Sequence, residues 1–185
     1  MELSEQEVIR RQSLQALRDL GINPYPAEEY PVNAISTVIK EHFNDLEGKE
    51  VQIAGRLMSR RIMGKASFCE VQDSKGRIQV YVSRDDIQAP VPEGAVAETA
   101  EQQMYNLVFK KLLDIGDFIG IRGIVFRTQM GEISIHAKEL KVLAKSLRPL
   151  PIVKYKDGVA YDGFNDPEQR YRQRYVDLIV NEGVK

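Results

Sequence analysis

Near the start of the chain, hydrophobic residues recur at the spacing of an α-helix. This pattern predicts a helix from Ser4 to Leu20, with Ser4 and Glu7 as a capping box and Gly21 as its stop. Three prolines in the nine residues NPYPAEEYP predict an extended connector, and a second short helix is expected from Ile35 to Phe43. The apolar positions of the first helix are Val8, Leu14, Leu17 and Leu20.

After Gly48 the hydrophobic period changes to two, which is the period of β-strands. Residues 51–63 predict a long strand with a bend at Gly55, and residues 66–83 predict a hairpin that turns at 73–76. An acidic stretch, 89–103, is expected to form a loop before a short helix at 104–114. Two further strands are expected at 117–129 and 132–143. Five strands with a helix between the third and fourth predict an OB-fold, which is a small, partly open β-barrel.

The expected hairpin places a phenylalanine among polar residues. If its turn has two or four residues, Phe68 faces Tyr81, Glu70 faces Gln79, and Gln72 faces Arg77, while a three-residue turn breaks this register. The opposite face is then a good core, formed by Cys69, Val71, Ile78, Val80 and Val82. Phe68 is either a core residue beside solvated charges or an exposed platform for a nucleobase, and this register favours the platform.

The distribution of charged residues along the chain indicates a local cationic binding site and not a protein that is basic overall. The chain has 26 Lys and Arg, 27 Asp and Glu, and a formal net charge of −1. Between Gly55 and Arg77, however, six cations stand against two acids, whereas Asp85 to Glu101 contains five acids and no cation. A cationic face with an aromatic residue and amides suits single-stranded nucleic acid, although OB-fold surfaces also bind sugars and peptides.

Other classes of site are not indicated. One cysteine and two histidines, His42 and His136, do not make a zinc site, and neither a phosphate-binding loop nor a dinucleotide-binding motif is present. The charged N-terminus does not resemble a signal peptide, and no apolar run approaches the ~20 residues of a membrane helix. We therefore expect no bound metal, no membrane contact and a cytoplasmic location.

The last residues predict a short helix. Asn165 or Asp166 is expected to cap it, with Pro167 in the first turn. Arg170 and Arg174 lie at helical spacing from Asp177. An apolar stripe, expected to pack on another domain or a partner subunit, consists of Tyr171, Tyr175, Leu178 and Ile179.

Six segments, occurring in order, resemble class II lysyl-tRNA synthetases of the bacterial type. The resemblance extends from about residue 10 to residue 181, and RRIMGKASF and RYRQRYVDLI favour the lysyl branch over the aspartyl and asparaginyl branches that share the barrel. The segments are LQALRDLGINPYP, RRIMGKASF, RIQVYVSRDD, GEISIH, LRPLP and RYRQRYVDLI.

This resemblance implies that the barrel binds the anticodon of a lysine tRNA, which is rich in uridine. It implies that Phe68 stacks on the central anticodon base, that Gln79 hydrogen-bonds this base with help from Arg61, and that Glu132 contacts a neighbouring base. The residues alone favour a solvated charge for Glu132. Possible phosphate contacts, each of which is otherwise a solvated cation, are Arg60, Lys65 and Arg77.

The resemblance also implies an enzyme, a lysine–tRNA ligase that uses ATP and magnesium and works as a homodimer. None of the three class II catalytic motifs occurs before Lys185, so we expect this chain to contain no catalytic residue and no cofactor site, and to be inactive alone. The expected domains are a helical extension at 1–48, the OB-fold barrel at 49–146, and a linker with the start of the catalytic domain at 147–185. The alternatives are a free-standing OB-fold that binds single-stranded nucleic acid, and a protein-interaction module.

Overall fold

The computed structural model describes residues 3–87, 104–151, 154–156, 159–161, 164–181 and 184. The chain divides into two compact units, Met1–Leu147 and Arg148–Lys185. The loop expected at 89–103 lies outside the described residues. Within the described residues, no helix is long and apolar enough to cross a membrane.

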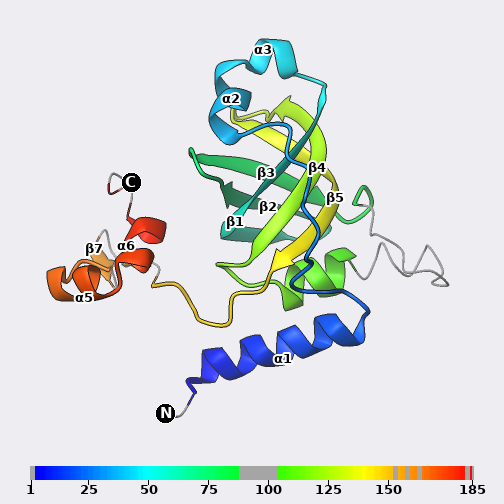
Figure 1. The fold of residues 1–185 in the computed structure, drawn as a ribbon. Helices are drawn as coiled ribbons and strands as arrows, with labels where there is room; N and C mark the ends of the chain where they lie inside the picture. The colour runs from blue at the N-terminus through cyan, green and yellow to red at the C-terminus, as the bar shows by residue number, and fades with distance from the viewer. Residues whose placement is uncertain are drawn as a thin grey trace. The chain divides into compact units, whose positions relative to one another are not determined.

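Five strands of the first unit form a closed barrel in the order β1-β2-β3-β5-β4 (Figure 1). All neighbouring strands are antiparallel except β3 and β5, which pair in parallel and close the barrel. The OB-fold predicted from the sequence is therefore confirmed. The strands are β1 (Glu50–Met63), β2 (Ala66–Gln72), β3 (Arg77–Ser83), β4 (Phe118–Arg127) and β5 (Ile133–Ala144).

The β2–β3 hairpin has the register expected for a four-residue turn. Phe68 pairs with Tyr81, and Glu70 pairs with Gln79. The opposite face is buried as predicted, at Cys69, Val71, Ile78, Val80 and Val82. Gly55 lies where β1 passes very close to β2, because a Cβ atom there would stand 2.4 Å from the carbonyl oxygen of Gln72.

Helix α1 (Glu5–Asp19) begins at the predicted capping box of Ser4 and Glu7. Its buried face differs from the one expected. Val8 is 40% exposed, whereas Arg10, Ser13 and Leu17 are buried. The face is partly polar because α1 packs on an end of the barrel that presents main-chain carbonyl groups, which hydrophobic periodicity does not reveal.

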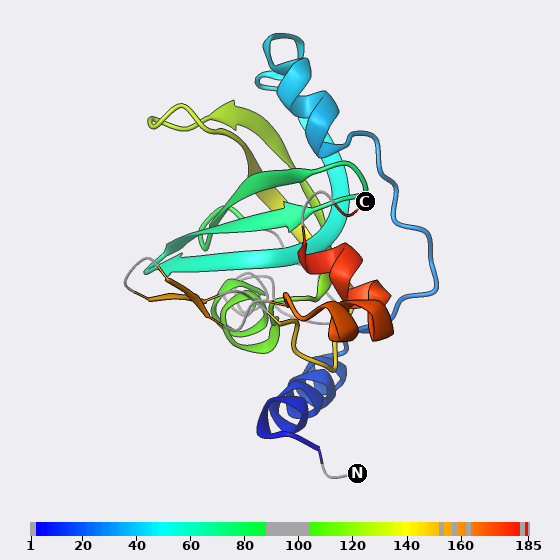
Figure 2. The same ribbon diagram turned by 90° about the vertical axis from the view of Figure 1, so that its left-hand side faces the viewer.

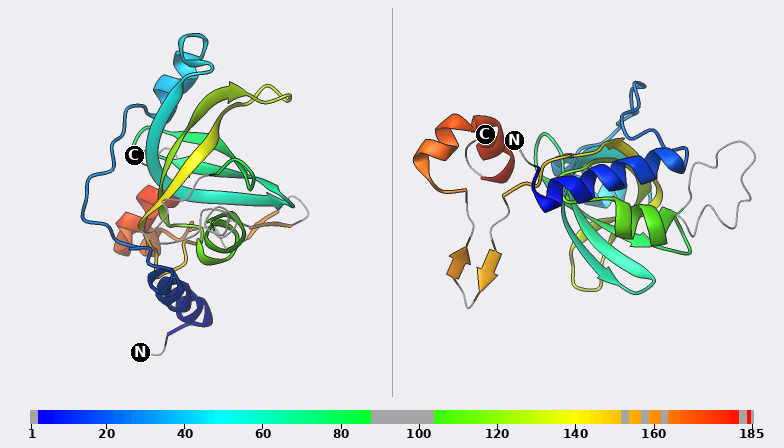
Figure 3. Two further views of the ribbon diagram at one scale, coloured as in Figure 1. Left: turned by 90° about the vertical axis from the view of Figure 1, so that its right-hand side faces the viewer. Right: turned by 90° about the horizontal axis from the view of Figure 1, so that it is seen from below.

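Two further sets of helices stand at the ends of the barrel. The helix expected at 35–43 is broken at His42 into α2 (Ser36–Glu41) and α3 (Phe43–Leu46). The helix η1 (Met104–Leu112) is a π-helix, and seen from below it lies beside α1 (Figure 3). The helices α2 and α3 lie at the opposite end of the barrel from α1 (Figures 1 and 2).

The second unit contains a small sheet and two short helices. Strands β6 (Lys154–Lys156) and β7 (Val159–Tyr161) pair within the expected linker, followed by α5 (Pro167–Arg172) and α6 (Arg174–Val180). Asp166 caps α5 by accepting hydrogen bonds from the main-chain N–H groups of Glu168 and Gln169. Of the two capping residues that the sequence allowed, Asn165 and Asp166, the structure therefore has Asp166.

The expected apolar stripe of the C-terminal helix is largely exposed within this unit. Tyr171 is 86% exposed and Tyr175 is 60% exposed. The helix breaks between α5 and α6, and the side chain of Asp177 is buried instead. Arg170 and Arg174 each donate a hydrogen bond of 2.8 Å to Asp177, which confirms their expected proximity.

Candidate nucleic-acid interface

Side chains on the outer face of the barrel form rows that run across the strands. One row joins Arg61 on β1, Phe68 on β2, Tyr81 on β3 and His136 on β5. The next row along the strands is formed by Ser59, Glu70, Gln79, Ser134 and Phe126. Because side chains two residues apart share a face of a strand, both rows face the same side.

A β-bulge in β1 decides which of two adjacent arginines joins this face. The register of β1 with β2 shifts between Leu57 and Ser59, so that one extra residue is inserted. After the shift, Arg60 lies opposite the buried Cys69, and Arg61 lies opposite Phe68. Simple alternation from the buried Leu57 would have placed Arg61 on the core side.

Phe68 has an aromatic neighbour on one side and a cation above it. Its ring centre is 5.3 Å from that of Tyr81, with the two planes tilted by 56°. The guanidinium carbon of Arg61 lies 5.8 Å from the centre of the Phe68 ring. Such a partly exposed ring beside a cation offers both stacking and electrostatic attraction to a nucleobase.

A groove of about 460 Å³ brings the four predicted anticodon residues together, since Arg61, Phe68, Gln79 and Glu132 all line it. The amide of Gln79 has no hydrogen-bond partner among the residues that the structure describes. An unpaired amide can donate to and accept from the edge of a base. The remaining lining residues are Lys40, Ser59, Arg60, Cys69, Glu70 and Arg77.

Glu132 stands at the entrance to β5, after the β4–β5 turn. Its main-chain N–H donates to Thr128 Oγ1 at 3.0 Å, which holds this end of the turn. Its carboxylate is 3.9 Å from Lys40 Nζ, and the side chain is 52% exposed. Lys40 comes from α2, and its place at the groove was not foreseen because no strand pattern connects it to the barrel.

Asp73 fixes α2, and with it Lys40, to the turn of the β2–β3 hairpin. Its carboxylate accepts hydrogen bonds from the main-chain N–H groups of Ser36 at 2.5 Å, Lys75 at 2.8 Å and Gly76 at 2.9 Å. Burial alone would raise the pKa of Asp73, but these hydrogen bonds outweigh it and lower the pKa. The charged form is therefore the one that holds the helix in place.

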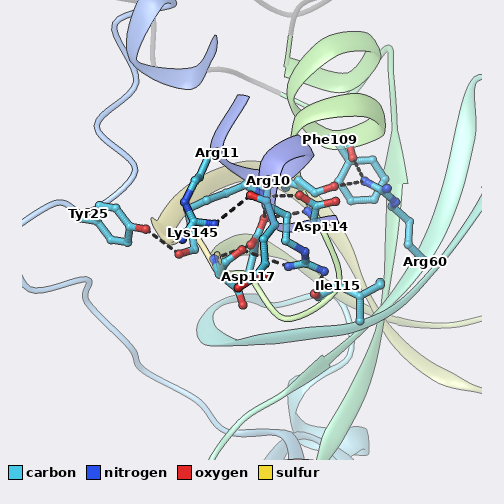
Figure 4. A network of polar contacts seen from close by, with 12 residues as sticks. Arg10, Arg11, Tyr25, Arg60, Phe109, Asp114, Ile115, Asp117 and Lys145 are labelled. Carbon is cyan, nitrogen blue, oxygen red and sulfur yellow. Dashed lines mark hydrogen bonds and ion pairs between the residues drawn. The ribbon is translucent and has the colours of Figure 1, made fainter. Parts of the chain in front are cut away.

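The structure does not direct the guanidinium group of Arg60 into the groove. That group donates to the main-chain carbonyls of Phe109 and Leu113, the latter at 3.0 Å, at the end of η1 (Figure 4). Burial lowers the pKa of Arg60, although Asp114, Cys69 and Asp117 oppose this effect. These hydrogen bonds give Arg60 a structural contact that caps a helix end, and its expected phosphate contact stays a prediction.

The other two residues that were predicted to contact phosphate, Arg77 and Lys65, lie at different positions relative to the groove. Arg77 lines the groove, where it donates to Gln72 Oε1 at 2.9 Å and to Glu70 Oε2 at 3.3 Å. Lys65 is exposed at the tip of the β1–β2 hairpin and is not among the lining residues of the groove. Arg77 is thus positioned at the predicted site, while Lys65 lies at the edge of the same face.

An aromatic cluster continues from Phe68 across the barrel. The ring of Tyr81 meets Phe126 and His136 edge-on, at centroid distances of 6.3 Å and 5.1 Å. The hairpin register already placed Tyr81 beside Phe68, but it could not reveal Phe126. That position depends on the pairing of β4 with β5, in which two bulges shift the register.

A second polar cluster lies at the end of the barrel near α1 (Figure 4). Lys145 is fully buried and forms ion pairs with Asp114 and Asp117, the latter at 2.8 Å. Arg10 of α1 donates to the carbonyls of Ser146 at 3.0 Å and Ile115 at 2.9 Å. Burial raises the pKa of Asp117, against the opposing effect of Lys145. This cluster joins α1 to the barrel and takes no part in the groove.

Comparison with known proteins gives close relatives along the whole chain. It is 61% identical to a lysine–tRNA ligase of Porphyromonas gingivalis over all of its residues, which correspond to 31% of that protein. It is 59% identical to lysine–tRNA ligases of Azobacteroides pseudotrichonymphae and Christiangramia forsetii, of which it covers 35% and 31%. The chain thus spans about a third of the length of the curated relatives it matches. The resemblance to lysyl-tRNA synthetases is confirmed.

The barrel itself matches a defined family. Residues 51–143, from the second residue of β1 to the penultimate residue of β5, match the tRNA anti-codon family, described as an OB-fold nucleic acid binding domain. All described lining residues of the groove except Lys40 lie within this range. The chain therefore belongs to the family of OB-fold nucleic acid binding domains.

Proposed function

We propose that this chain recognises the anticodon of lysine tRNA as part of a lysine–tRNA ligase. The observation that carries the proposal is the convergence of Arg61, Phe68, Gln79 and Glu132 in one groove of a nucleic-acid-binding barrel. The names of the relatives support lysine as the amino acid. The face formed by β2 and β3 and the β4–β5 loop is also where OB-folds bind oligonucleotides.

In this proposal the central base of the anticodon stacks on Phe68. The amide of Gln79, which is unpaired among the described residues, accepts from and donates to the edge of a uracil, and Arg61 binds a carbonyl or a phosphate beside it. Glu132 accepts a hydrogen bond from a neighbouring base, with Lys40 close to its carboxylate. Lys65 and Arg77 add electrostatic attraction to the phosphates.

The whole protein, in this proposal, joins lysine to its tRNA with ATP and magnesium in the cytoplasm, and it acts as a homodimer. None of the residues discussed above is assigned to ATP, magnesium or the reaction. The segment 147–185 would connect the barrel to the catalytic domain. We further propose that these 185 residues alone do not support lysine-dependent exchange of pyrophosphate into ATP.

Binding of RNA stem-loops tests the proposal. The chain is titrated at one fixed salt concentration with a stem-loop that carries the lysine anticodon and with a control whose loop sequence is scrambled. We expect tighter binding to the uridine-rich loop, and a loss of about 1–3 kcal/mol of binding free energy in Phe68→Leu. Gln79→Ala should weaken binding, whereas Gln52→Ala, on β1 and outside the groove, should leave it unchanged.

The outcome also separates the alternatives. Equal affinity for both loops would favour a free-standing OB-fold that binds single strands without sequence preference. No binding to either loop would favour a protein-interaction module. Pyrophosphate exchange by the chain alone would contradict the proposal that it lacks an active site.

A further inference from the structure

A buried tyrosine in the first turn of η1 joins this helix to the β1–β2 hairpin. The hydroxyl group of Tyr105 lies 2.8 Å from Ser67 Oγ, and it donates a hydrogen bond of 3.1 Å to the main-chain carbonyl of Gly64. A phenol has a single proton to donate and the carbonyl only accepts, so Ser67 is the donor to Tyr105. The two hydrogen bonds therefore form a chain that runs from β2, through η1, to the turn of the hairpin.

The surroundings of Tyr105 allow it one orientation. The side chain is fully buried, and its ring stacks on that of Phe109 with 5.9 Å between the ring centres and 17° between the planes. The ammonium group of Lys110 lies 4.7 Å from the centre of the Tyr105 ring and donates to the same Gly64 carbonyl at 2.7 Å. A buried ring that is packed in this way and fully hydrogen-bonded fixes the backbone to which it binds.

Ser67, the partner of Tyr105 on β2, directly precedes Phe68. Alternation along β2 places the Ser67 side chain on the buried side and Phe68 on the outer face. The two residues share a peptide group, so a shift of Ser67 also moves the ring of Phe68. The core gives the paired end of β1 little support, because none of the residues 59–65, all of which the structure describes, is buried.

We propose that Tyr105 is a positioning residue for Phe68, and that it acts through Ser67 to fix the plane on which a nucleobase stacks. The inference rests on the proposed function, because it assumes that a base of the RNA loop stacks on Phe68. A binding side chain keeps its productive geometry, to within about 0.5 Å, only when packing and hydrogen bonds around it fix its position. The helix that carries Tyr105 is a π-helix, a rare form that is frequent at functional sites.

Removal of single hydroxyl groups tests the inference. Tyr105→Phe removes the hydroxyl and keeps the ring, and Ser67→Ala removes the hydroxyl of its partner. Tyr25→Phe is the matched control, because the Tyr25 hydroxyl also donates to a main-chain carbonyl, that of Lys145 at 2.7 Å, and Tyr25 is not among the lining residues of the groove. These variants and the double variant are titrated with the lysine-anticodon stem-loop at one fixed salt concentration. Thermal melting establishes that each one is folded.

We expect Tyr105→Phe to weaken binding about threefold, which is a part of the effect of removing the Phe68 ring. Ser67→Ala should have the same effect. The double variant should bind no more weakly than either single variant, because both substitutions remove the same hydrogen bond. In a Phe68→Leu background, Tyr105→Phe should change the affinity no further, and Tyr25→Phe should bind like the wild type.

The stacking geometry is measured separately by NMR of the Phe68 ring protons, which are assigned by comparison with Phe68→Leu. A stacked base shifts these signals by its ring current, and at saturating RNA the size of the shift does not depend on affinity. We expect the full shift in the wild type and in Tyr25→Phe, and a smaller shift in Tyr105→Phe and Ser67→Ala. A lower melting temperature of Tyr105→Phe with an unchanged ring shift and unchanged affinity would overturn the inference, because Tyr105 would then be a structural residue only.

Failure of this inference differs from failure of the proposed function. If the wild type prefers the lysine loop and Phe68→Leu weakens its binding, while Tyr105→Phe binds like Tyr25→Phe, only the positioning role of Tyr105 is rejected. Additive losses in the double variant would also reject this role, because the two hydroxyl groups would then act through separate contacts. If the wild type does not distinguish the lysine loop from the scrambled loop, the proposed function itself fails.

Discussion

Two regions of this barrel gather arginines, lysines and carboxylates, yet they use them differently. In the cluster beside α1, the buried Lys145 pairs with the buried Asp117 and the partly exposed Asp114, and the buried Arg10 donates to two main-chain carbonyls. In the groove of the outer face, the amide of Gln79 is unpaired among the described residues, and Lys40 stands 3.9 Å from Glu132. In the first region the charged side chains bind one another and the main chain, whereas the second region leaves polar groups available to a ligand.

Arg60 and Arg61 show this difference between adjacent residues. The bulge in β1 turns Arg60 toward the end of η1, where two carbonyl groups accept its hydrogen bonds. Arg61 remains exposed on the outer face above Phe68. Local charge in a sequence therefore indicates a binding surface only when the backbone register shows which charges reach it.

Removal of the buried ammonium should have the largest effect on stability. We expect Lys145→Met to lower the free energy of unfolding by about 3–5 kcal/mol, because Asp117 is left charged and buried without its partner. Chemical denaturation measures the change. Lys141→Met, on β5 just before Lys145, is the matched control, because its exposed pair with Glu28 at 3.6 Å should contribute less than about 1 kcal/mol. Similar losses in both variants would contradict the distinction between the regions.

Arg60→Gln should affect stability and leave RNA binding intact. The substitution leaves the carbonyl groups of Phe109 and Leu113 without their charged donor, so we expect unfolding to become easier by about 1–3 kcal/mol. The affinity of the folded variant for the lysine stem-loop should equal that of the wild type. A clear loss of affinity without loss of stability would restore Arg60 as a phosphate contact.

Arg61→Gln should show the reverse behaviour. Its guanidinium group is exposed above Phe68, so its removal should hardly change the denaturation midpoint. We expect a loss of about 1–2 kcal/mol in binding free energy. If Arg61 contacts a phosphate, the slope of log affinity against log salt should also fall by about 0.7, the value for a single strand. Unchanged affinity would remove Arg61 from the proposed site.

Local patterns were sufficient to predict the strands, the barrel and the face that carries Phe68 and Gln79. The hairpin register follows from alternation and turn length, and both are encoded within eighteen residues, 66–83. The side on which Arg61 lies could not be derived this way, because the bulge at 57–59 reverses the alternation. Its role came only from resemblance to a family.

The contacts that were missed depend on segments far apart in the sequence. Lys40 reaches the groove because Asp73 binds the start of α2, and Phe126 reaches Tyr81 through the pairing of β4, β5 and β3. The buried face of α1 includes Arg10 because its partners are carbonyl groups of residues more than a hundred positions away. Periodicity describes one segment at a time and contains no information about such partners.

The smallest expected effect concerns the pH dependence of the junction that holds α2 at the groove. Because the pKa of Asp73 is lower in the folded chain than the ordinary value of about 4, its hydrogen bonds stabilise the fold fully above that pH. As the pH falls through the lowered pKa, this contribution is lost. We expect it to amount to less than about 1 kcal/mol, since the carboxylate is partly solvated.

Denaturation midpoints of wild type and Asp73→Asn, measured from pH 7 to pH 3, test this expectation. The variant should be less stable at pH 7 and should lose less stability on acidification, so that the two curves converge at low pH. Asp45→Asn is the matched control, because Asp45 is an exposed aspartate on α3 whose removal changes the charge equally. Parallel curves for wild type and Asp73→Asn would mean that the carboxylate does not hold α2 through its charge. The position of Lys40 beside Glu132 would then depend on packing between α2 and the hairpin turn, and the groove would keep its shape at acidic pH.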